Sequence, residues 1–187
     1  MIVKKSIAAG VLISIGVYGL LYTNYSLISI ILFSFALYTI CSRGYYLFTG
    51  KCGYAYEDPN ITLTTLIVIF SFNVFTCYLI GLIFSVISPE IIPIAATKVA
   101  TWELTTNYGW KSFFCGIIMY LAVRIYNDKN SPLGILIGVP LFLLCGFQHC
   151  IANATILGVS QTWSNVIFYC AFKNFIGAMI MRFLEGI

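Results

Sequence analysis

The chain has 187 residues, of which 60% are hydrophobic and 9% are charged, with a mean hydropathy of +0.96 and a formal net charge of +4. Soluble domains carry roughly 25% charged residues, so this composition excludes an ordinary soluble domain. The positive charge is spread along the sequence and forms no basic run, so it does not predict nucleic-acid binding. The composition indicates an integral membrane protein that is surrounded by lipid.

Six apolar stretches follow one another along the chain, and each is close to the length of about 20 residues that a spanning helix needs. They are residues 6–22, 27–49, 61–88, 108–126, 133–157 and 165–184. The first stretch follows two lysines as a secretory signal would, but no convincing cleavage site comes after it, so we interpret it as a helix. The sequence therefore predicts an all-α integral membrane protein with six transmembrane helices and no room for a soluble domain.

Six of the ten basic residues lie on one side of the membrane in this six-helix arrangement. They are Lys4, Lys5, Lys51, Arg124, Lys129 and Arg182. The opposite side has two uncharged links, 23–26 and 158–164, and the longer loop 89–107, which carries Lys98. Lysine and arginine concentrate on the cytoplasmic side of membrane proteins. We therefore expect both termini to be cytoplasmic, with the protein in the plasma (inner) membrane.

The predicted helices divide into two halves of three, residues 1–88 and 108–187, within one transmembrane channel domain, 1–187. Glycine and polar residues interrupt the second helix of each half, at 41–50 and at 145–153. Three helices per half place the halves in opposite orientations, and inverted repeats with broken helices are typical of a permeation site at mid-membrane. The alternative is that these small residues only let helices pack closely.

His149 is the only histidine, and it lies within the second interruption. An ionisable group at membrane depth indicates a functional site by default. The alternative is a neutral histidine that bonds a backbone carbonyl and packs helices together. Cys145 and Cys150 lie close by in sequence, but no second ligand cluster exists elsewhere, so we expect neither a metal site nor a cofactor.

Four segments resemble those of one known family. Residues 146–153, Gly-Phe-Gln-His-Cys-Ile-Ala-Asn, resemble the GFEHSxAN signature of the formate/nitrite transporter family. Residues 46–50 resemble its LFTGN motif, 7–16 are similar to its first helix, and 114–123 are similar to its LCNxLVCLAV segment. The resemblance runs from end to end, with shortened loops. It implies an aquaporin-like protomer of two inverted three-helix repeats, a homopentamer with one pore per protomer, and transport of small monovalent anions or weak acids such as formate, nitrite and hydrosulfide.

The resemblance also implies a set of residues that line the pore. They are the central pair His149 and Thr49, the apolar constriction residues Phe33, Leu37, Leu47 and Phe142, the vestibule residue Lys98, and the motif positions Asn153, Gln148 and Gly116. Two of these positions depart from the family pattern. Gly116 replaces an asparagine and Gln148 replaces a glutamate, so one polar group and one charge are missing.

Simple electrostatics favours the same interpretation. A bare anion pays a large desolvation cost between apolar side chains, whereas an anion that takes a proton from His149 or from water crosses as a neutral acid. Lys98 at the mouth would concentrate anions. The main alternative is a channel for a small neutral solute, because Gly116 and Gln148 make the pore less polar.

We also considered an integral-membrane enzyme that uses His149. General acid–base chemistry needs a second group within reach. The carboxylates, Glu57, Asp58, Glu90, Glu103, Asp128 and Glu185, lie outside the apolar stretches or at their ends. We therefore predict a channel and no enzyme activity.

Overall fold

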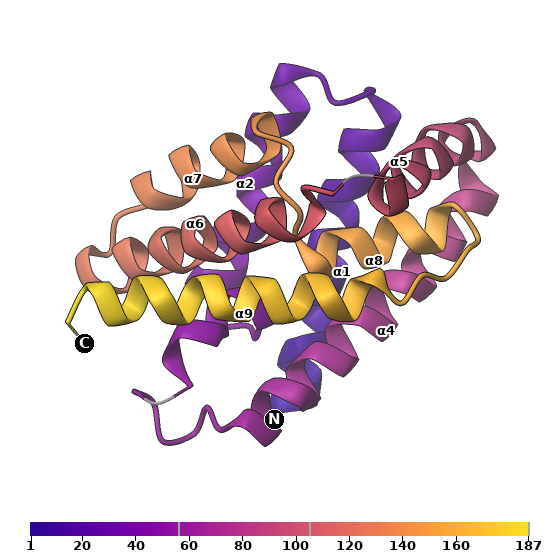
Figure 1. Cartoon of the computed structure of the whole chain (residues 1–187). Coiled ribbons are helices and arrows are strands. Elements are labelled where there is room, and N and C mark those ends of the chain that lie inside the picture. The colour runs from indigo at the N-terminus through magenta and orange to yellow at the C-terminus, as the bar shows by residue number, and fades with distance from the viewer. Residues whose placement is uncertain (56, 105, 187) are drawn as a thin grey trace.

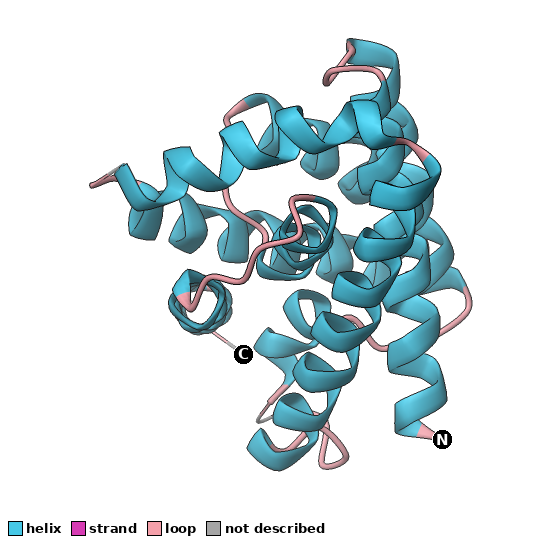
Figure 2. Ribbon diagram, turned by 90° about the vertical axis from the view of Figure 1, so that its right-hand side faces the viewer, coloured by secondary structure: helices cyan, strands magenta, loops and turns pink. Residues whose placement is uncertain are grey.

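The computed structural model describes residues 1–55, 57–104 and 106–186. Most of these residues lie in helices and none lies in a strand (Figure 2). The prediction of an all-α protein is confirmed. The C-terminal Ile187, which ends the second predicted half, lies outside the described residues.

The helices are, in chain order, α1 (Ile2–Tyr22), α2 (Leu27–Ser42), α3 (Phe48–Lys51), the 3₁₀ helix η1 (Cys52–Tyr54), α4 (Leu63–Ile87), the 3₁₀ helix η2 (Pro89–Ile91), α5 (Ile92–Leu104), α6 (Tyr108–Lys129), α7 (Leu133–Leu144), α8 (Cys150–Val159) and α9 (Val166–Leu184). Figure 1 shows α6 and α9 running side by side, with α7 next to α6. On the other side of the bundle, α1 packs against α2 and α4, and α4 packs against α8.

The outside of this bundle is as apolar as its inside. Large side chains such as Ile28, Leu32 and Val86 are 71%, 65% and 78% exposed, although each lies on a regular helix. Water would not favour such a surface, whereas lipid tails are as apolar as these side chains. The exposed face is therefore suited to contact with lipid or with another apolar protein surface.

Three of the described helices, α1, α4 and α9, are long and apolar enough to cross a membrane by length and composition alone. The second and fifth predicted stretches are each divided in two, into α2 and α3 and into α7 and α8. The structure also has a helix that we did not predict, α5, which lies in the 89–107 loop and packs against α8. The count of six spans therefore stays a prediction.

The two breaks have the same backbone geometry. Gly44 and Gly146, which follow α2 and α7, have positive φ angles of 62° and 65°. The next residue in each break donates its N–H to a carbonyl five positions back, Tyr45 to Ile40 at 2.8 Å and Phe147 to Phe142 at 2.9 Å. This pattern is the glycine-dependent Schellman ending of a helix. Glycine is favoured here because an L side chain strains the left-handed conformation.

A buried asparagine holds the far side of each break. Asn73 Oδ1 accepts from the N–H of Phe48 at 2.9 Å, and its Nδ2 donates to the carbonyls of Ser6 at 2.8 Å and Tyr46 at 3.0 Å. The side chain thus satisfies three backbone groups that the interrupted helices leave without a partner. It also ties α4 to α1 and to the start of α3.

Asn174 repeats this pattern in the second half. Its Oδ1 accepts from the N–H of Cys150 at 3.0 Å, and its Nδ2 donates to the carbonyls of Ser112 at 2.6 Å and Gln148 at 2.9 Å. Asn174 therefore ties α9 to α6 and to the start of α8. The two asparagines place the ends of α3 and α8 inside the bundle.

Candidate pore site

Thr49 and His149 come together from the two breaks. Thr49 lies in α3, and His149 is the residue before α8. Thr49 Oγ1 lies 2.8 Å from His149 Nε2, and the two residues are 1% and 2% exposed. Two polar groups 100 positions apart in the chain thus form one buried pair.

The hydrogen bonds of the imidazole indicate where its proton lies. The backbone N–H of Ala152 donates to Nδ1 of His149 at 3.1 Å, so Nδ1 acts as an acceptor. A neutral imidazole whose Nδ1 accepts carries its hydrogen on Nε2. From this pattern we assign Nε2–H as the donor to Thr49 Oγ1. The hydrogen of the Thr49 hydroxyl can then be donated to a third group.

The bond to Ala152 also makes His149 the N-cap of α8. N-cap side chains accept a hydrogen bond from the first turn of a helix and so stabilise its start. We expected a packing histidine to bond a backbone carbonyl, but this one accepts from a backbone N–H. His149 therefore has a local structural role together with its contact to Thr49.

Aromatic rings adjoin the histidine on one side. The ring of Phe142 stacks on the imidazole with centroids 5.8 Å apart, and Phe33 meets Phe142 edge-on at 6.3 Å. Both phenylalanines are buried, as are Leu37 and Leu47. The four predicted constriction residues thus lie in the interior rather than on the lipid-facing surface.

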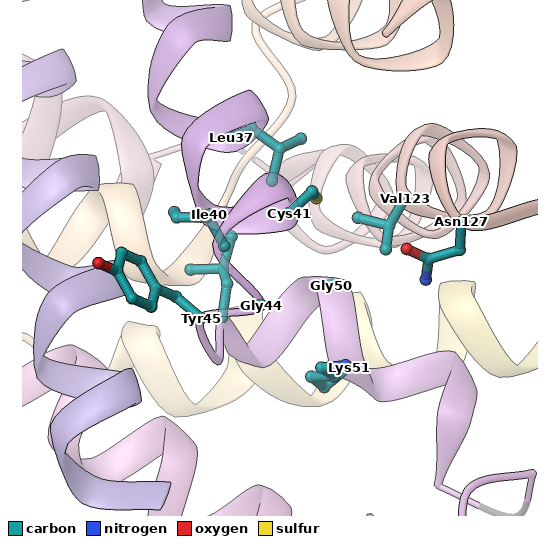
Figure 3. A pocket seen from close by; sticks show the side chains of 10 residues that line it. Leu37, Ile40, Cys41, Gly44, Tyr45, Gly50, Lys51, Val123 and Asn127 are labelled. Atoms are coloured by element: carbon teal, nitrogen blue, oxygen red, sulfur yellow. The ribbon is translucent and has the colours of Figure 1, made fainter. Parts of the chain in front are cut away.

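Two cavities lie in the interior and share no lining residue. The first, of about 100 Å³, lies between α2, α3 and α6 (Figure 3), and we name it the Lys51 vestibule. Its lining residues are Leu37, Ile40, Cys41, Gly44, Tyr45, Leu47, Gly50, Lys51, Val123 and Asn127. The second, of about 60 Å³, we name the Lys98 vestibule; it includes Lys98, Phe142, Gln148, His149 and Asn153 in its lining. Thr49 lies in sequence between two lining residues of the first cavity and bonds a lining residue of the second.

The Lys98 vestibule combines one cation with an amide network. Lys98 Nζ lies 3.7 Å from the centroid of the Tyr25 ring, and burial lowers the pKa of this ammonium from its usual value. Asn153 Nδ2 donates to Gln148 Oε1 at 3.1 Å and to the Tyr108 hydroxyl at 3.0 Å. The structure thus brings Lys98, Gln148 and Asn153 together beside His149.

Gly116 does not join this site. A Cβ placed on Gly116 would lie 2.0 Å from the carbonyl oxygen of Asn174, so this position faces α9 and not a cavity. Its counterpart in the first half is Gly10, whose Cβ would lie 3.2 Å from the carbonyl oxygen of Asn73. The interpretation of Gly116 as a missing polar pore group is corrected: glycine here lets α6 approach α9 closely.

The sequence did not lead us to the cation of the first vestibule. Lys51 directly follows Gly50, at the position where the LFTGN motif has asparagine. That departure was the available signal, but a lysine next to a loop reads as an ordinary basic surface residue. Only the return of α6 past α3 places Lys51 and Asn127 around one cavity.

These features define the fold: a helical bundle in which two broken helices meet at a buried polar pair between two cavities. The fold is similar to a solved structure described as a pentameric formate channel with formate bound, with a TM-score of 0.72. The similarity covers 97% of this chain and 92% of that one, at 16% sequence identity. The all-helical fold expected from the formate/nitrite transporter resemblance is confirmed, whereas the six spans and the two inverted repeats stay predictions. No family model and no curated protein sequence matches the chain.

Proposed function

We propose that the chain is a channel for small monovalent anions or their weak acids, of the formate, nitrite and hydrosulfide class, and that it belongs to the formate/nitrite transporter family. The supporting observation is the Thr49–His149 pair, which separates two cavities that each contain a lysine. The similarity in fold to a formate channel is consistent with this function. We assign it no enzymatic activity.

The proposal includes the architecture. The protomer crosses the membrane six times, with α2 and α3 forming one interrupted span and α7 and α8 another. Residues 1–88 and 108–187 form two inverted repeats, a reading that the matched glycine endings and matched asparagine bonds support. Five protomers assemble into a pentamer in the inner membrane with both termini cytoplasmic, as the distribution of basic residues favours.

Transport would follow from the order of groups along the path. A lysine in either vestibule raises the local concentration of anions. The buried side chains of Leu37, Leu47, Phe33 and Phe142 then offer nothing to replace the water around an ion, so a charged species pays a high cost there. A weak acid crosses these positions in its neutral form, with the Thr49 hydroxyl hydrogen free to bond its oxygen.

The proton for this step would come from vestibule water rather than from His149. A neutral imidazole has one hydrogen, and losing it from Nε2 would leave an anionic ring in an apolar site. Adding a second proton at Nδ1 would remove the acceptor that caps α8. His149 would therefore act as a fixed neutral donor that orients Thr49.

The test is a flux panel with the purified protein in liposomes, using formate, nitrite and hydrosulfide against neutral solutes such as urea. At pH values well above the pKa of each acid, its flux should rise by about tenfold per unit fall in pH, in step with its neutral-acid fraction, and near that pKa the rise should level off. Empty liposomes at each pH give the background of acid that crosses lipid unaided. Protein-dependent flux that is independent of pH, and as fast for urea as for formate, would instead establish the neutral-solute channel.

A further inference from the structure

Lys51 is a lining residue of a cavity that is separate from the Lys98 vestibule. We propose that the Lys51 vestibule is a second anion-binding site, where Lys51 holds a small monovalent anion before it reaches Leu37 and Leu47. This inference rests on the proposed channel function and adds a specific site to it. Because the N–H of Tyr46 donates to the carbonyl of Lys5 at 3.3 Å, this site lies at the N-terminal mouth of the protein.

Two aromatic rings hold the Lys51 ammonium in place. Its Nζ lies 5.3 Å from the centroid of the Tyr46 ring and 5.5 Å from that of the Tyr54 ring. The Tyr54 hydroxyl in turn accepts from Asn127 Nδ2 at 2.9 Å, and Asn127 lines the same cavity. Cation–π contacts of this kind orient an ammonium without neutralising its charge. The positive charge therefore remains available to a ligand.

No carboxylate lies within ion-pair distance of Lys51 among the residues that the structure describes, although the charge of Asp58 acts on its ammonium from farther away. The ion pairs on this side join Arg124 to Glu57 and Asp128, and Arg182 to Glu57. A second ammonium lies close by, since Lys5 Nζ is 5.1 Å from the centroid of the same Tyr46 ring. Two like charges around one ring repel each other, and an anion between them and the cavity would relieve that repulsion.

The size of the cavity selects the ligand. A volume of about 100 Å³ accommodates a small anion with one or two waters, since a water molecule occupies about 30 Å³ in the liquid. Leu37 and Leu47 form part of its wall, so a bound anion already adjoins the apolar residues that it must pass. The site therefore fits the small monovalent anions of the proposed function.

The test compares half-saturating formate concentrations from each side of the membrane, in right-side-out and inside-out vesicles. Lys51→Gln should raise the half-saturating concentration by about fivefold when formate is supplied from the N-terminal side, the factor expected for one screened charge. Lys51→Arg keeps the charge and should stay within about twofold of the unchanged protein. Lys129→Gln, an exposed lysine on α6, is the matched loss of one charge and should change nothing.

Lys98→Gln completes the design, because it should raise the half-saturating concentration from the opposite side only. A crossed pattern of this kind supports two separate anion sites. A half-saturating concentration that Lys51→Gln leaves unchanged, or one that Lys51→Arg raises equally, overturns the Lys51 site alone. Absence of any protein-dependent formate flux in the unchanged protein overturns the proposed function and this site with it, whereas flux that does not saturate from the N-terminal side overturns the Lys51 site alone.

Discussion

The two helix breaks share one backbone geometry and differ in where their polar side chain lies. Both end a helix at a left-handed glycine, and both are held by a buried asparagine, Asn73 of α4 in the first break and Asn174 of α9 in the second. At equivalent positions, one residue before the new helix, the first break has Leu47 and the second has His149. Leu47 gives no side-chain cap, whereas His149 accepts from Ala152.

The same backbone geometry therefore presents its polar side chain at a different position in each break. In the first break the residue before the helix is apolar and lines a cavity, and the polar group, Thr49, comes two positions later. In the second break the residue before the helix is itself the polar group. The two breaks are complementary because Thr49 of one bonds His149 of the other. Substitutions in the two breaks and in the helices that hold them should therefore change stability or formate flux, and the largest effect is expected for the asparagines.

Loss of the asparagine brace should have the largest effect. Asn174→Ala leaves the N–H of Cys150 and the carbonyls of Ser112 and Gln148 without their partner. Each unsatisfied buried group costs about 1–3 kcal/mol, so for three groups we expect a loss of roughly 3–9 kcal/mol in stability. Thermal unfolding in detergent measures it, and Asn107→Ala, at an exposed asparagine, is the control. Equal melting temperatures would mean that the brace is dispensable.

The two close approaches of glycine should differ in cost. An alanine Cβ at Gly116 would meet the backbone oxygen of Asn174 at 2.0 Å, whereas at Gly10 the nearest atom is the Thr76 Cβ at 2.9 Å. Backbone cannot yield as a side chain can, so Gly116→Ala should cost about 2–3 kcal/mol and Gly10→Ala less. Gly19→Ala, with nothing within 4 Å, is the control in the same unfolding assay. A larger loss of stability in Gly10→Ala than in Gly116→Ala would contradict the assignment of the backbone contact to Gly116.

Replacing His149 separates its role as the N-cap of α8 from its role in transport. His149→Phe removes the acceptor for the Ala152 N–H, which costs about 1 kcal/mol, and leaves an apolar path that should lower formate flux by about tenfold or more. His149→Asn keeps an N-cap acceptor, so it should stay as stable as the unchanged protein while the flux still changes. Unfolding and liposome flux are measured on the same samples. A His149→Asn protein whose formate flux equals that of the unchanged protein at every pH would leave His149 with its structural role alone.

The smallest effect belongs to the threonine. Thr49→Val keeps the shape of the side chain but removes the acceptor for Nε2–H and the hydroxyl hydrogen that we assign to the passing acid. Formate flux should fall by about fivefold to tenfold, the equivalent of one hydrogen bond. Thr49→Ser retains the hydroxyl and should preserve most of the flux. Equal losses in both variants would point to packing of the methyl group rather than to the hydroxyl.

The sequence by itself determined the class of fold and the central pair. Its apolar stretches predicted helices in lipid, because backbone groups there must bond within their own segment. The glycines at 44 and 146 marked the two breaks, since a left-handed ending favours glycine, and this signal is local. The pairing of His149 with Thr49 was implied by the resemblance of their two motifs to the formate/nitrite transporter family.

The tertiary structure decided what depends on the facing helix. The sequence predicted that Gly116 marks the loss of a polar pore group, yet Gly116 faces the Asn174 carbonyl because α6 packs closely against α9 there. Lys51 reads as a surface charge, yet α6 closes a cavity around it. The sequence did not predict helix α5, although this helix places Lys98 in the lining of the cavity that His149 also lines. A side chain's direction within a bundle follows from long-range packing, and neighbouring residues along the chain do not encode it.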